Sequence, residues 1–188
     1  PENALLSHDL FEGNFARCGF VSDIEFFEDF PSHSGVWAIR SHRWIRGDWQ
    51  LLPWIFSARD EGISIIGRWK MLDNLRRSLV PPMTFLLIVL ELATLHTGLS
   101  VWFLLAMSSF FVPAILVFAA DIFPKRRTYP LWQHVQFTVR EVVLSIKSSL
   151  LGLVLLPYRA WISMDAIIKT LYRLFISHKN LLEWTTAD

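Results

Sequence analysis

Cysteine is almost absent from this sequence: Cys18 is the only one in 188 residues. A single cysteine excludes an internal disulfide framework and fits a reducing compartment. Cysteine and histidine also lack the spacing that metal sites show, so no metal site is expected within the chain. The net charge is only +1. A strong positive field that would attract nucleic acid is therefore not expected, and neither is a nucleic-acid partner.

The first ten residues, PENALLSHDL, lack an initiator methionine, a basic segment and an apolar core. They are therefore not expected to be a signal peptide. We expect the chain to be a piece of a longer polypeptide.

Apolar and aromatic residues are abundant. The chain is 53% hydrophobic, its mean hydropathy is +0.37, and it has nine tryptophans and fifteen phenylalanines. Soluble domains typically have about 45–50% apolar residues, and aromatic residues gather at membrane interfaces. The composition therefore favours a protein that contacts a lipid bilayer.

Residues 1–80 mix charges, aromatics and turn residues. Short alternations of apolar and polar residues at 18–31 predict one or two strands. The segment 67–79 predicts an amphipathic helix, with an apolar stripe of Trp69, Leu72, Leu75 and Leu79. The two prolines that follow, Pro81 and Pro82, are expected to punctuate the chain.

Residues 81–123 are predicted to form a transmembrane helical hairpin. The stretch 83–123 has no lysine or arginine and is long enough for two spans, with a turn at 96–100. Basic residues flank it on both sides, which by the positive-inside rule predicts that both ends face the cytoplasm. A buried helical hairpin in a soluble protein is the alternative. Residues 124–188 predict amphipathic, interfacial helices that lead to a downstream domain, although a third span at 142–164 is also open.

Two short segments carry residue types that a glycosyltransferase needs. Such an enzyme requires a carboxylate that takes a proton from the acceptor hydroxyl, a cation that holds the departing diphosphate, and an aromatic face for a sugar ring. Asp9 in LSHDLFEG supplies the first. In RSHRW, at 40–44, Arg43 with Arg40 supplies the second and Trp44 the third. Taken singly, Asp9 could be a helix acid and the Arg–Trp pair a membrane anchor.

The order of these segments resembles the last two motifs of processive, membrane-bound family-2-type glycosyltransferases, which usually read Thr-Glu-Asp and Gln-x-x-Arg-Trp. Here His8 replaces the glutamate and Arg40 replaces the glutamine. Both departures occur in bacterial osmoregulated glucan synthases. The stretches RGDWQLLPW, GRWKMLDNLRRSLVPP and NLLEWTTA look most like the cyclic β-1,2-glucan synthases among them.

This resemblance implies a mainly α chain: the C-terminal part of a GT-A-like α/β glycosyltransferase domain, followed by transmembrane and interfacial helices. It implies a multi-pass protein of the bacterial inner membrane whose catalytic part is cytoplasmic. The intact enzyme would polymerise glucose from UDP-glucose onto a growing glucan chain. Its divalent metal, Mg or Mn, would be bound by residues upstream of this chain. The fragment alone is therefore expected to be inactive.

The resemblance also assigns roles to individual residues. Asp9 is the expected general base, Arg43 and Arg40 are expected at the diphosphate, and Trp44 is expected at the acceptor glucose. His8, His42 and Asp48 are expected around these groups, and Asp48 could instead pair with Arg46 or contact the sugar. Arg76 and Arg77 are expected only to set membrane topology. Two rival functions stay open, a synthase of linear periplasmic β-glucan and a non-catalytic membrane scaffold.

Overall fold

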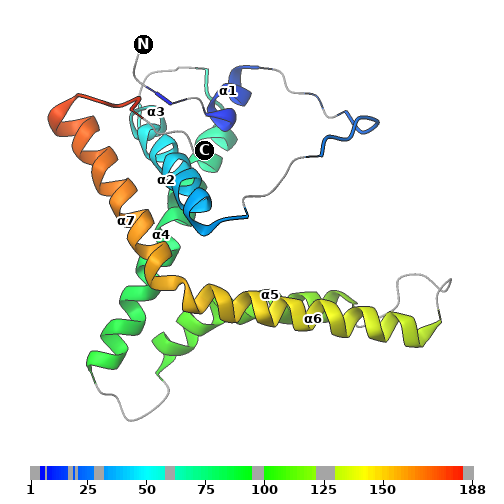
Figure 1. Cartoon of the computed structure of the whole chain (residues 1–188). Coiled ribbons are helices and arrows are strands. Elements are labelled where there is room, and N and C mark those ends of the chain that lie inside the picture. The colour runs from blue at the N-terminus through cyan, green and yellow to red at the C-terminus, as the bar shows by residue number, and fades with distance from the viewer. Residues whose placement is uncertain are drawn as a thin grey trace. The chain divides into compact units, whose positions relative to one another are not determined.

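The structure, a computed structural model, describes residues 5–6, 8–16, 19, 21–27, 32–57, 62–94, 100–121 and 130–183. Every regular element in these ranges is a helix. In chain order they are α1 (Asp9–Phe15), α2 (Ser34–Gln50), α3 (Leu52–Ile55), α4 (Ile65–Ala93), α5 (Val101–Asp121), α6 (Leu131–Val154), α7 (Leu156–Tyr172) and the π-helix η1 (Arg173–Ser177) (Figure 1).

The chain divides into two compact units. Unit 1 is Pro1–Pro81 with Arg159–Asp188, and unit 2 is Pro82–Tyr158. One boundary falls within α4 between the two prolines, and the other falls within α7. Pro81 and Pro82 therefore lie inside a helix and do not end it. Because proline has no backbone N–H, this pair removes two hydrogen bonds from the middle of α4.

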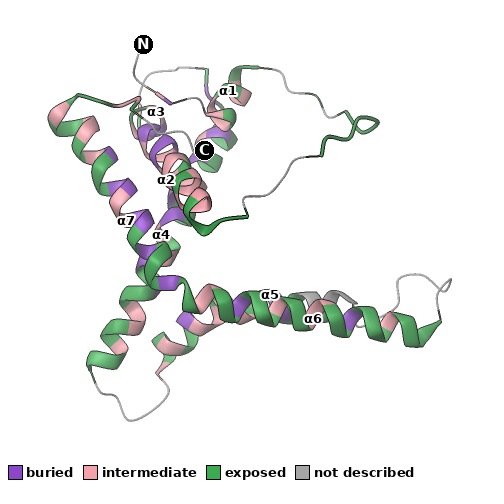
Figure 2. Ribbon diagram, viewed as in Figure 1, coloured by how far each residue is buried: buried purple, intermediate pink, exposed green. Residues whose placement is uncertain are grey.

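The core of unit 1 is formed where α2 and α3 meet the first turns of α4. Its buried members are Leu51, Ile55, Ile63, Met71 and Leu75. Phe11 of α1 packs against this cluster and stacks edge-on against Trp54, with 5.3 Å between the ring centroids. Figure 2 shows buried residues on α2, on the first part of α4 and on α7, whereas most of α5 and α6 is exposed.

The predicted helix at 67–79 is confirmed, but its buried face differs from the predicted stripe. Leu75 is buried, as expected, and it shares its face with Gly67 and Met71. Trp69 and Leu72 are 64% and 45% exposed. A Cβ at residue 67 would collide with the side-chain amide of Asn14 of α1 unless that side chain moved. The small residue at 67 therefore lets α1 lie close to the buried face of α4.

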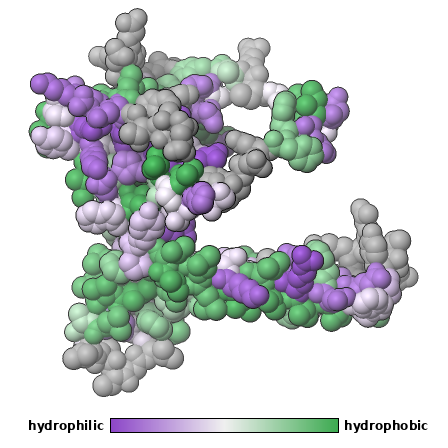
Figure 3. Space-filling model, viewed as in Figure 1, coloured by the Kyte–Doolittle hydropathy of each residue, from purple (hydrophilic) through white to green (hydrophobic). Residues whose placement is uncertain are grey.

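Unit 2 contains the second half of α4 with α5 and α6. Helices α5 and α6 lie side by side (Figure 1), and the hydroxyl of Ser149 donates to the carbonyl oxygen of Phe110 at 2.5 Å. Gly152 of α6 faces the ring of Phe110 as well. Many apolar side chains of this pair are exposed, and Figure 3 shows hydrophobic surface over much of both helices, interrupted by hydrophilic patches.

The GT-A-like α/β part of the predicted fold class is wrong for the described chain, in which every regular element is a helix. Residues 21–27, within the predicted strands, are not in a strand, and Phe26 and Phe27 are more than 90% exposed. Apolar alternation alone does not make a sheet, since a strand needs a partner to hydrogen-bond with and a face to bury. The GT-A-like sheet that the resemblance implied therefore has no counterpart in the ranges that the structure covers.

The predicted transmembrane hairpin is also not supported. Within the described residues, none of the helices combines the length and apolar character that a bilayer crossing requires. Helix α4 ends at Ala93 and α5 begins at Val101, so the two helices end and begin on either side of the predicted turn. The possible third span at 142–164 is divided between α6 and α7. Most of the predicted turn at 96–100 and the basic flank at 124–127 lie outside the described residues, as do Ser7 and Cys18.

Candidate functional site

A cavity of about 580 Å³ in unit 1 brings together residues from the two segments that the sequence singled out. Asp9 reaches it from the start of α1, and Arg43 and Trp44 reach it from the middle of α2. Arg77 of α4 and Arg159 of α7 line it as well. A carboxylate, guanidinium groups and indole rings therefore share one cavity, which is the set of groups that transfer from a nucleotide-sugar requires.

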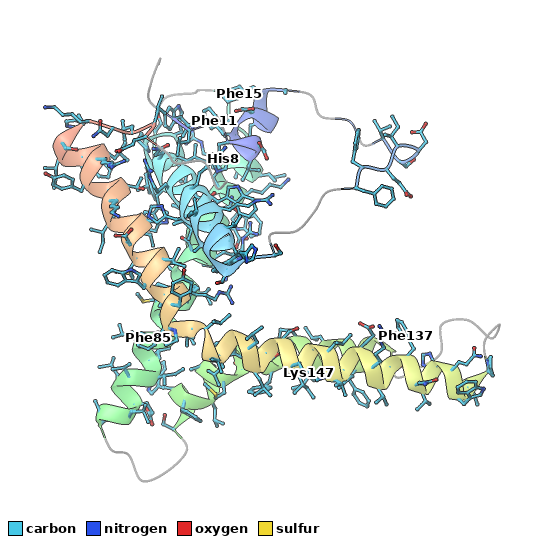
Figure 4. All side chains as sticks on the ribbon, viewed as in Figure 1. His8, Phe11, Phe15, Phe85, Phe137 and Lys147 are labelled. Carbon is cyan, nitrogen blue, oxygen red and sulfur yellow. The ribbon has the colours of Figure 1, made fainter. Side chains whose placement is uncertain are left out.

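His8 shapes the start of α1, next to Asp9. Its Nδ1 accepts a hydrogen bond from the backbone N–H of Phe11 at 3.4 Å, and its own backbone N–H donates to the carboxylate of Glu12 at 3.2 Å. These two bonds satisfy N–H groups at the helix start, as in a capping box. His8, Phe11 and Phe15 are labelled in Figure 4 on this short helix. Asp9 is the first helical residue and is exposed.

Asp48 links three helices through one carboxylate oxygen. Its Oδ1 accepts from Nε2 of His8 at 2.9 Å and from the amide of Asn74 at 2.7 Å. Because a carboxylate only accepts, the neutral His8 ring carries its proton on Nε2, and its Nδ1 is free to cap α1. Gly47 allows this arrangement, since a Cβ there would lie 3.3 Å from Cδ2 of His8. Asp48 therefore holds the Asp9 segment against α2 and α4.

The pairing of Asp48 with Arg46, one of the open alternatives, is not what the structure shows. Two residues apart on a helix, these side chains point to different faces. Arg46 is buried and donates to the carbonyl oxygens of Leu181 at 3.1 Å and Glu183 at 2.5 Å. Gln50, one turn on, donates to Leu181 at 2.7 Å, and its Oε1 accepts from the backbone N–H of Leu6 at 2.9 Å.

Arg40 and Trp44 form a stacked pair on α2. The Arg40 guanidinium carbon lies 4.7 Å from the centroid of the Trp44 ring, which is 57% exposed. Residues four apart share a helix face, so this cation–π contact follows from the spacing of RSHRW. Arg43 lines the cavity, whereas Arg40 is not among the described residues that do. The roles predicted for Asp9, Arg40, Arg43 and Trp44 stay predictions.

No protein-family model matches this chain. The chain is 43% identical over 187 residues to the protein named Cyclic beta-(1,2)-glucan synthase NdvB from Rhizobium meliloti (strain 1021). The resemblance seen in the motifs is confirmed. The aligned region covers 99% of this chain but only 7% of that relative, so the chain spans a small part of the relative's length.

Two arginines were not predicted to belong to the site. Arg77 was expected to set membrane topology and Arg159 to lie at a membrane interface, yet both line the cavity. Asn74 was missed as well, although it lies one helical turn before Arg77 and contacts it. A polar face of Asn74, Arg77 and Ser78 on α4 is the signal that was available in the sequence. The contribution of α7 depends on a contact distant in sequence, which no local pattern reveals.

His42 does not line the main cavity. Its Nε2 lies 3.0 Å from Oδ2 of Asp165 on α7, and Nζ of Lys169 lies 2.7 Å from the same oxygen. His42 and Asp165 line a separate recess of about 230 Å³ in unit 1, which Arg46 and Trp161 also line. The expected place of His42 around Asp9 and Arg43 is therefore not what the geometry gives.

Burial lowers the pKa of His42 below its usual value, although the hydrogen bond and the charge of Asp165 oppose this change. Burial alone would raise the pKa of Asp165, but its bonds from Lys169 and His42 lower it. At neutral pH a neutral His42 therefore donates to a charged Asp165. As the pH falls below about 6.5, the unfolded state binds the proton of His42 more readily than the folded state does. The contact between α2 and α7 accordingly loses stability in that range.

We expect the wild-type amides of α7 to exchange hydrogen faster at pH 5.5 than at pH 7.5, after correction for intrinsic exchange. The measurement is hydrogen exchange with mass spectrometry on a full-length protein that contains this segment. His42→Gln keeps a donor for Asp165 without the titrating group, so this pH dependence should shrink. His33→Gln, at the exposed residue before α2, is the control. Equal pH dependence in wild type and His42→Gln would contradict the prediction.

The described residues hold no cluster of three or more His, Cys, Asp or Glu side chains that could bind a metal ion. The divalent metal expected for the intact enzyme was placed on residues outside this chain, so this finding does not bear on it.

Proposed function

We propose that this chain is part of a membrane-associated glucosyltransferase that polymerises glucose from UDP-glucose into cyclic β-1,2-glucan. The observation that carries the proposal is the shared cavity of Asp9, Arg43 and Trp44, in a chain 43% identical to a segment of a cyclic glucan synthase. The location at the bacterial inner membrane is part of the proposal. A multi-pass path is not, because the described helices do not support one.

In this proposal, the acceptor hydroxyl oxygen attacks the anomeric carbon of the donor glucose. Asp9 takes the hydroxyl proton, a new C–O bond forms, and the bond between the anomeric carbon and the phosphate oxygen breaks. UDP leaves with the bonding electrons, and Arg43 stabilises the charge that develops on the diphosphate. The indole of Trp44 supports the acceptor glucose, and Arg40 stabilises that indole from its other side.

The bonds of His8 explain how Asp9 could be held in place for this step. The ring of His8 is hydrogen-bonded at both nitrogens, to the backbone N–H of Phe11 and to the carboxylate of Asp48. These two bonds together fix the backbone at residues 8 and 9. A base held in one position spends less time away from the reactive geometry, which favours catalysis. The donor uridine and the metal would be bound elsewhere in the intact enzyme, so the segment alone should be inactive.

The test is glucan synthesis from radiolabelled UDP-glucose in membranes that contain a full-length protein with this segment, followed by linkage analysis. A cyclic β-1,2-linked product is expected. A linear product with another linkage would keep the glycosyltransferase and reject cyclic β-1,2-glucan. No product from an intact, folded protein would reject the enzyme in favour of a scaffold.

A further inference from the structure

Arg77 and Arg159 line the same cavity as Arg43 but come from different helices, α4 and α7. We propose that these three arginines together bind the diphosphate of the nucleotide-sugar donor. The assignment rests on the proposed function and adds two ligand-binding residues to it. Like Arg43, both belong to unit 1, so the cavity is complete within one compact part of the chain.

The charges around the cavity favour an anionic ligand. Its described lining contains three arginines and two carboxylates, Asp9 and Asp48. Asp48 is already engaged by His8 and Asn74, and its side chain is only 15% exposed. It therefore offers little to a cationic ligand. Arginine in turn matches phosphate oxygens with its planar set of donors.

Arg77 is held by residues one helical turn before it. Its Nε lies 3.2 Å from Oδ2 of Asp73, and its Nη2 contacts the amide oxygen of Asn74. A guanidinium has five N–H donors, so these contacts leave donors for a ligand. Asn74 also donates to Asp48. Hydrogen bonds thus connect Arg77 through Asn74 and Asp48 to His8. Arg77 also lines the same cavity as Asp9, the expected base.

Arg159 is positioned in a different way. Its guanidinium carbon lies 5.7 Å from the ring centroid of Trp37, another residue of the cavity wall. A cation–π contact of this kind restricts a flexible side chain without using all of its hydrogen-bond donors. Ordering the arginine before binding reduces the entropy that a ligand must overcome. Arg77 and Arg159 would therefore contact a diphosphate from two different helices, α4 and α7.

Arg76 provides a matched control for Arg77. Both side chains are about equally exposed, at 65% and 63%, and both pair with Asp73. Only Arg77 is among the described residues that line the cavity. If only the loss of a surface charge matters, substitutions of Arg76 and Arg77 should weaken ligand binding equally. If Arg77 contacts the ligand, only its substitution should weaken binding.

The experiment measures equilibrium binding of radiolabelled UDP and UMP to a folded, full-length glucan synthase carrying this segment. Arg77→Gln and Arg159→Gln should each weaken UDP binding about 10-fold, as expected for a lost charge-assisted hydrogen bond. The loss should be smaller for UMP, which has one phosphate. Arg77→Lys should recover part of the affinity, because the charge remains. Arg76→Gln should leave it within about two-fold of wild type, since an exposed pair contributes little.

Unchanged UDP affinity in both glutamine variants, in a protein that still makes glucan, would overturn this inference and leave the proposed function intact. The same holds if Arg76→Gln weakens binding as much as Arg77→Gln. A wild-type protein that neither binds UDP nor makes glucan would overturn both. If the arginines hold lipid phosphate, the variants would keep their UDP affinity but change how activity depends on added phosphatidylglycerol vesicles, which also overturns the inference.

Discussion

Asp9→Asn is expected to lower glucan synthesis by about 10²–10⁴-fold while leaving UDP-glucose binding unchanged. The amide has nearly the shape of the carboxylate, but it cannot take the acceptor proton. The measurement compares incorporation of radiolabelled glucose with equilibrium binding of UDP-glucose, both in a full-length protein with this segment. The loss should therefore fall on the chemical step.

Glu12→Gln is the matched control for Asp9→Asn. Glu12 lies on the same short helix, and its side-chain oxygen accepts from the backbone N–H of His8. Glutamine keeps that acceptor and removes only the charge, so synthesis should stay within a few-fold of wild type. Full activity in Asp9→Asn would show that Asp9 is only a helix acid. Loss of donor binding in that variant would show that Asp9 contacts the nucleotide.

Arg43→Gln is expected to weaken UDP binding by about 10–100-fold, because a charge-assisted hydrogen bond contributes about 1.5–3 kcal/mol. Glucan synthesis at low UDP-glucose should fall by at least the same factor. Arg43→Lys should recover only part of the loss, because an ammonium group cannot form the paired contacts of a guanidinium. Titration with radiolabelled UDP measures the affinity directly.

Arg40→Gln tests whether Arg40 and Arg43, which lie three residues apart in the motif, have different roles. Arg40 stacks on Trp44, so its removal should reduce extension of the acceptor more than binding of UDP. An equal loss of UDP affinity in Arg40→Gln and Arg43→Gln would mean that both contact the diphosphate, as the motif by itself suggested. It would contradict the separation that the cavity lining indicates.

The sequence grouped Asp9, Arg43 and Trp44 because motif order depends on residue identity, and their roles stay predictions. Asp9, Arg43 and Trp44 share one cavity, as expected of residues that act together. The helix at 67–79 was accessible from the sequence, since its apolar residues follow the helical period. Its buried face was not, because α1, which is distant in sequence, lies close to that face at Gly67.

The remaining features depend on contacts between distant parts of the chain. Asp48 bonds to His8 and Asn74, and Arg159 stacks on Trp37, and no local pattern reports such pairs. The strands at 18–31 were inferred from alternation without a partner strand. The transmembrane hairpin was inferred from composition across 83–123, but none of the described helices is both long and apolar enough to cross a bilayer.

One buried amide connects the two ends of the described chain. Gln50 holds the carbonyl oxygen of Leu181 with its nitrogen and the backbone N–H of Leu6 with its oxygen, and Leu6 precedes His8 by two residues. A displacement of residues 181–183 must break the bonds to Gln50 and Arg46, which withdraws the support of the segment that carries Asp9. Residues 181–183 are thus connected through Gln50 to the start of α1, and a force that pulls on residues 181–183 would displace Asp9, the expected base.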